Sequence, residues 1–157
     1  MLKTLTRTVL LMVATGFFVG VSIAGPIDQT VEKVLVEYSA IQQTLSNDSV
    51  QGIDSAAQKI GALASETRAS DPDVQALIDD LKATSGKIQG QDLETARDTF
   101  FELSKPLLVY LNKYYSGSNT YFRYFCGMAK KGWVQTEKGT RNPYYGSSML
   151  TCGDLIG

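Results

Sequence analysis

The feature that most constrains this fold is the return of apolar residues at three- and four-residue steps over most of the chain. Val31, Leu35 and Tyr38 belong to the first such stripe, and further stripes follow as far as Tyr114. This spacing places apolar side chains on one face of an α-helix. It predicts four helices, which occupy about residues 28–47, 50–69, 72–89 and 92–115. Four amphipathic helices joined by short loops predict an all-α fold, an antiparallel four-helix bundle.

Two prolines mark specific positions in these helices. Asp71-Pro72-Asp73 is a clear helix start, because the first aspartate can cap the helix and proline fits its first position. Pro106 lies inside the last predicted helix, where it removes one backbone donor.

The chain changes character after Tyr115. Residues 116–157 are rich in aromatic residues and glycine, and show no helical periodicity. Glycine permits turns that helices disfavour. The sequence therefore predicts an irregular C-terminal segment that packs its aromatic side chains on the bundle and is held by a covalent or metal cross-link.

Residues 1–24 have the layout of a secretory signal peptide. Lys3 and Arg7 precede an apolar run, and Ser22 and Ala24 place small residues at a cleavage site before Gly25. The pattern predicts a periplasmic or secreted protein with a single helical domain, residues 25–157, and no stable membrane insertion after cleavage. An uncleaved anchor is the alternative, although the run is short for a membrane span.

Charge is divided unevenly along the predicted mature chain. Residues 25–112 hold seven basic and fourteen acidic residues, a net charge of −7, while residues 113–157 have a net charge of +4. The basic part is aromatic and lacks a block of lysine and arginine, which argues against a nucleic-acid partner.

Four sulfur side chains are the main candidate site. Cys126 and Met128 form a Cys-x-Met arm, and Met149 and Cys152 form a Met-x-x-Cys arm. In an oxidising compartment, the only two cysteines of a chain are expected to form a disulfide, here Cys126–Cys152. Alternatively, each arm can point both of its sulfurs at one centre. Soft sulfur ligands of this kind select Cu(I) or a similar ion.

An enzyme is not expected. The chain has no histidine, and neither cysteine lies in a Cys-x-x-Cys motif. Acidic pairs such as Asp79 and Asp80 are typical of solvated helix faces.

The C-terminal motif resembles a domain of unknown function found in exported bacterial proteins and in periplasmic adaptor subunits of copper/silver and heavy-metal efflux systems. That family carries a Cys-Pro-Met-Ala element, a tryptophan, and an Asn-Pro-Tyr-x-Gly-x-x-Met-x-x-Cys-Gly element. The matching residues here are Cys126, Met128, Ala129, Trp133, Asn142, Pro143, Tyr144, Gly146, Met149, Cys152 and Gly153. Gly127 stands where proline is usual.

The resemblance implies an exported heavy-metal-associated binding protein whose partner is a heavy-metal efflux protein or another envelope protein. On this interpretation Cys126, Met128, Met149 and Cys152 contact the metal, and Trp133, Asn142, Pro143, Tyr144 and Gly146 support them. The alternative is a structural or interaction domain without a metal, stapled by the Cys126–Cys152 disulfide.

Overall fold

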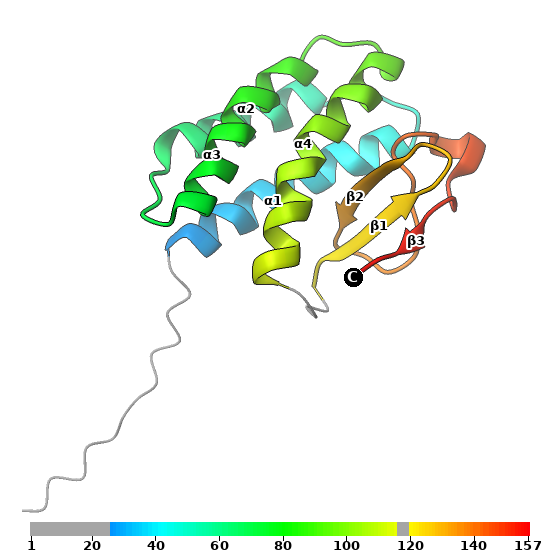
Figure 1. Cartoon of the computed structure of the whole chain (residues 1–157). Helices are drawn as coiled ribbons and strands as arrows, with labels where there is room; N and C mark the ends of the chain where they lie inside the picture. The colour runs from blue at the N-terminus through cyan, green and yellow to red at the C-terminus, as the bar shows by residue number, and fades with distance from the viewer. Residues whose placement is uncertain (1–25, 116–119) are drawn as a thin grey trace, which may run out of the picture.

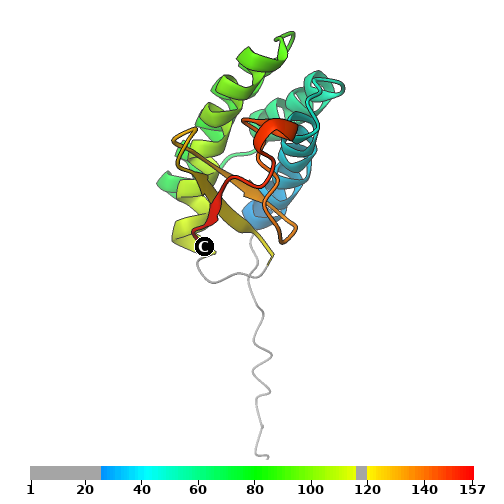
Figure 2. The ribbon, with the colours of Figure 1, turned by 90° about the vertical axis from the view of Figure 1, so that its right-hand side faces the viewer.

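The computed structural model describes residues 26–115 and 120–157, which form a layer of helices followed by a small layer of strands (Figure 1). The helices are α1 (Pro26–Ser46), α2 (Ile53–Glu66), α3 (Pro72–Ser85) and α4 (Leu93–Tyr114), with the short 3-10 helix η1 (Gly86–Ile88) before α4. The second layer contains β1 (Phe122–Cys126), β2 (Lys131–Gln135), the 3-10 helix η2 (Gly146–Met149) and β3 (Asp154–Leu155). Figure 2 shows the strands and the C-terminal segment on one side of the helices.

The prediction of an all-α fold is wrong, because the C-terminal segment forms a three-stranded antiparallel sheet in the order β2-β1-β3. Tyr124 in the central strand pairs with Trp133 on one side and with Leu155 on the other. Four of the five residues of β1 are buried. The exposed position holds Phe125 and one buried position holds Arg123, so β1 lacks the alternation of polar and apolar residues that identifies strands in a sequence.

The helices begin and end for local reasons. The Asp71 carboxylate accepts hydrogen bonds from the Asp73 and Val74 amides at the start of α3, and Asp92 caps α4 through the Thr95 amide. The predicted helix 72–89 ends at Ser85 and continues as η1. Helix α4 runs through Pro106 as one element.

Aromatic residues join the two layers. The ring of Tyr38 in α1 stacks on that of Phe100 in α4, with 4.8 Å between centroids. The Tyr38 hydroxyl lies 2.7 Å from the Ser104 hydroxyl and accepts a hydrogen bond from the Val134 amide of β2. The Tyr144 hydroxyl donates to the Gly132 carbonyl, also in β2. Two tyrosines therefore pair backbone groups that the free edge of β2 would otherwise leave unpaired.

Gly132 lets β2 approach α4 closely. A Cβ atom at this position would lie 3.0 Å from Leu108 Cδ1 and 3.1 Å from the Tyr124 carbonyl oxygen. The absence of a side chain therefore sets the distance between the sheet and the helix that it packs against.

Within residues 26–115 and 120–157, no helix is long and apolar enough to cross a membrane. The predicted signal peptide, residues 1–24, lies outside the described residues.

Candidate functional site

The sheet brings the two cysteines together. Cys126 is the last residue of β1, and Cys152 lies two residues before β3, whose Asp154 pairs with Phe125. Both thiols are free and lie within hydrogen-bonding reach of each other. Cys126 is fully buried, whereas Cys152 is partly exposed. The site is therefore a pair of adjacent thiols with an inner and an outer member.

Hydrogen bonds around Cys126 favour its thiolate form. Burial acts to raise the pKa of the Cys126 thiol, but hydrogen bonds from Cys152, from the amides of Ala129 and Met128 and from the Asn142 side chain outweigh it, and the pKa is lowered. The pKa of Cys152 is raised, mainly because its thiol is hydrogen-bonded to Cys126 and secondarily because of burial. The first proton lost by the pair therefore leaves Cys126, and Cys152 shares its own proton with the resulting thiolate.

Asn142 connects the two arms that carry the cysteines. Its side-chain amide donates to the Cys152 carbonyl at 2.8 Å and also contacts the Cys126 thiol. Its side-chain oxygen accepts hydrogen bonds from the backbone amides of Tyr144 and Tyr145. Its backbone amide donates to the Leu150 carbonyl. This fully buried residue therefore fixes the distance between the two arms.

Trp133 forms the surface on which the second arm lies. Its ring stacks on Tyr124 with 5.5 Å between centroids and meets Tyr144 edge-on. A Cβ atom at Gly153 would lie only 2.4 Å from the Trp133 ring. Glycine next to Cys152 is therefore required for this close approach.

Arg97 of α4 holds the turn that follows Asn142. Its guanidinium donates to the Pro143 carbonyl at 2.9 Å, to the Leu45 carbonyl at 3.0 Å and to the Asp48 carboxylate at 2.5 Å. Gly146 has φ of +55° and lies so close to Asp48 and Arg97 that a side chain there would overlap both. Sequence reasoning missed Asp48 and Arg97 as parts of this site, because no local spacing links them to the cysteines.

The methionines lie nearer the surface than the thiols. Met128 is 68% exposed and Met149 is 37% exposed. The Met128 amide hydrogen-bonds to the thiols, and the Cys152 amide donates to the Met149 carbonyl at 3.0 Å. Of the four sulfur residues predicted from the sequence, the fold thus brings the two cysteines into contact and places the two methionines on the surface.

The donors at this site are sulfur atoms. Among the residues that the structure describes, no three His, Cys, Asp or Glu side chains are placed to share a metal ion. A soft ion held here would therefore have the two thiolates as its protein ligands, with thioethers as the further candidates. Such a donor set suits Cu(I) and other soft ions better than Mg²⁺ or Ca²⁺.

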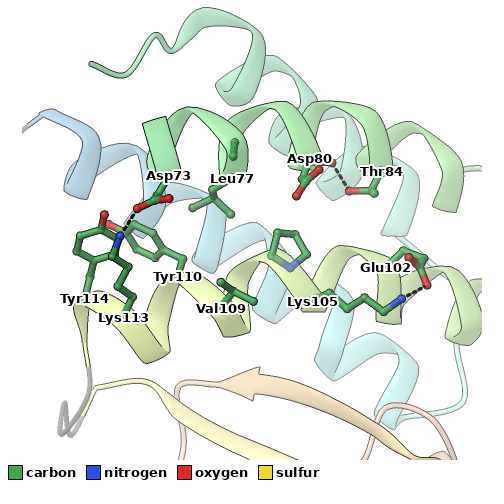
Figure 3. A pocket seen from close by; sticks show the side chains of 12 residues that line it. Asp73, Leu77, Asp80, Thr84, Glu102, Lys105, Val109, Tyr110, Lys113 and Tyr114 are labelled. Carbon is green, nitrogen blue, oxygen red and sulfur yellow. Dashed lines mark hydrogen bonds and ion pairs between the residues drawn. The ribbon is translucent and has the colours of Figure 1, made fainter. Parts of the chain in front are cut away.

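A groove between α3 and α4 has a volume of about 370 Å³ (Figure 3). Leu77, Pro106, Val109 and Tyr110 make its middle apolar. An ion pair between Lys113 and Asp73 joins the two helices at one end. The two cysteines do not line this groove.

Comparisons with known proteins found no family model, no curated protein and no solved structure that matches this chain. The resemblance to the exported heavy-metal-associated domain accordingly rests on the C-terminal motif alone and stays a prediction.

Proposed function

We propose that this chain is an exported protein that binds Cu(I) or a similar soft ion through Cys126 and Cys152. The observation that carries the proposal is the contact between the two thiols at the junction of β1 and the arm before β3. Two thiolates held side by side form a compact soft-ligand pair. The hydrogen bonds to Cys126 lower the cost of losing the proton that metal binding displaces.

Met128 and Met149 contribute secondarily in this proposal. Their side chains are exposed, so an arriving ion can meet them as well as the partly exposed Cys152. Thioethers carry no proton, and they are soft ligands for Cu(I). The ion would be handed to or received from a heavy-metal efflux protein or another envelope protein. Export rests on the predicted signal peptide, residues 1–24.

Titration of the reduced protein with Cu(I), in competition with a chromogenic Cu(I) chelator, tests the proposal. We expect about one equivalent bound, loss of binding in Cys126→Ser and Cys152→Ser, and weaker binding in Met128→Leu and Met149→Leu. Thr151→Ala, beside Cys152 on the exposed arm, is the matched control and keeps full binding. Binding below about half an equivalent, or binding that survives both cysteine substitutions, contradicts the proposal.

The contact between the thiols also favours a second function, a structural or interaction domain stapled by a Cys126–Cys152 disulfide. Neighbouring strands already hold the two segments together, so the bond would require little movement of the backbone. Protein alkylated before cell lysis, and then weighed with and without reduction, separates the two functions. A permanent staple gives no alkylated cysteine and a gain of two hydrogens on reduction, whereas a metal site gives two alkylated thiols.

A further inference from the structure

The two cysteines differ in how an outside molecule can reach them. Cys126 has no exposed surface, while Cys152 is partly exposed. Thiol–disulfide exchange requires that the attacking sulfur touch a sulfur of its partner. A disulfide in solution can therefore meet Cys152 but not Cys126.

Hydrogen bonds also hold the backbone of Cys152 in place beside Cys126. The Asn142 side chain donates to the Cys152 carbonyl at 2.8 Å, and the Thr140 hydroxyl donates to the Gly153 carbonyl at 3.1 Å. These bonds hold two consecutive backbone carbonyls, those of Cys152 and Gly153. They keep the Cys152 sulfur beside Cys126, where a reaction between the two has the advantage of an intramolecular step.

From this geometry we propose that the pair carries out ordered thiol–disulfide exchange, in which Cys152 takes up half of an external disulfide and Cys126 is the resolving cysteine. In the first step Cys152 gives up its proton, and its sulfur attacks one sulfur of the disulfide. A mixed disulfide forms at Cys152, and the other half leaves as a thiolate.

In the second step the Cys126 thiolate attacks the Cys152 sulfur, and the second half leaves as a thiolate. The Cys126–Cys152 bond forms, the protein loses two hydrogens as protons, and the external disulfide is reduced to two thiols. The substrate class is thus a small or accessible disulfide. The inference depends on the position of the two thiols and is independent of metal binding.

The test uses reduced protein and oxidised glutathione, followed by intact mass measurement at timed intervals after acid quenching. The wild-type protein ends two hydrogens lighter, with no glutathione attached. Cys126→Ser accumulates a stable adduct of one glutathione at Cys152. Cys152→Ser reacts at least about tenfold more slowly, because Cys126 is buried. In guanidinium chloride the two single variants react at equal rates, which shows that the fold causes the difference.

Equal reaction rates of the two folded variants would overturn the proposal. A folded Cys126→Ser variant that fails to form the adduct would overturn it as well. If either variant does not fold, peptide mapping of the wild-type intermediate decides, since the order requires the first glutathione on Cys152. Adduct found mainly on Cys126 contradicts it. The Cu(I) titration is unaffected by these outcomes, so failure of the exchange and failure of metal binding are distinguishable.

Discussion

Helices α1 to α4 bury apolar residues at regular three- and four-residue steps, whereas strands β1 to β3 depend on contacts between residues far apart in the chain. In the helical layer, Leu35, Ile60, Ile78 and Leu107 are each fully buried. In the strand layer, the segments are held in their arrangement by Asn142, by glycines that allow close contacts and by the cysteine pair. Both layers contribute buried apolar side chains to the core, but the second also depends on a few specific contacts between segments that are far apart in the chain.

The largest effect is expected from Trp133→Ala, which tests whether the two layers unfold together. Trp133 is fully buried and contacts Tyr144, which in turn contacts Phe100 of α4. We expect the free energy of unfolding to fall by about 3 to 5 kcal/mol. Urea titration followed by the helical circular dichroism signal measures it. The exposed Leu155→Ala change in β3 is the control and is nearly neutral.

A helical transition that stays at the wild-type urea concentration in Trp133→Ala would show that the layers unfold separately. The helical layer and the strand layer would then differ in stability more than their packing suggests.

Oxidation of the cysteine pair is expected to stabilise the protein by somewhat less. The Cys126–Cys152 bond closes a loop of 27 residues, which in the chain-entropy model contributes on the order of 3 kcal/mol. Urea titration of oxidised and reduced protein gives the difference. The double variant Cys126→Ser/Cys152→Ser must show the same midpoint with and without reductant. Equal stability of the two redox states in the wild type would mean that the strand layer needs no cross-link.

Tyr38→Phe tests the hydroxyl that joins the helices to the free edge of β2. The change leaves the ring in place but removes the partner of the Val134 amide and of the Ser104 hydroxyl. A buried donor without a partner costs about 1 to 3 kcal/mol. Tyr145→Phe is the matched control, because the contacts described for Tyr145 use its backbone amide and carbonyl. A loss no larger than in the control would argue that water replaces the hydroxyl.

The smallest effect concerns Asp48, which ties the end of α1 to the turn after Asn142. Hydrogen bonds from the Ser147 side chain, from Arg97 and from the Ser147 amide lower the pKa of Asp48 to about 2. Because the unfolded carboxyl titrates near pH 4, this contribution to stability is complete above about pH 4 and is lost as the pH falls toward 2.

Thermal unfolding between pH 6 and pH 2.5 measures this contribution. Asp48→Asn should flatten the acid side of the stability profile, while Asp80→Asn on the exposed face of α3 should leave its shape unchanged. If Asp48→Asn follows the wild-type profile throughout, the contacts of Asp48 with Arg97 and Ser147 do not contribute to the stability of the folded protein.

The sequence predicted the helices well, because the buried residues of each helix recur at three- and four-residue steps within a short segment. The stripe that contains Leu77 and Leu81 and the cap at Asp71 both lie within α3 or directly before it. The strands were missed for the opposite reason. In β1 the exposed position holds Phe125 and a buried position holds Arg123, and nothing in the strand itself shows that Leu155 will pair with Tyr124.

A hairpin signal was nevertheless present in the sequence. Aromatic residues from Tyr121 to Phe125 and the run Gly132 to Gln135 flank a short glycine-containing turn, which is typical of two paired strands.

The candidate site was only partly predictable. The two cysteines could be named, because the chain has no others, but their inner and outer positions follow from the register of β1 and β3. Arg97 and Asp48 lie far from the cysteines in the sequence and support the site through the turn at Gly146. Contacts of this kind depend on how the two layers pack, and no short sequence pattern predicts that packing.

The position of Trp133 gives this protein an optical probe of its own. It is the only tryptophan in the chain, and its ring lies against Gly153, the neighbour of Cys152. Any rearrangement of the arm that carries Cys152 therefore changes the surroundings of a single indole. The emission of the unlabelled protein can report in real time when its thiols react.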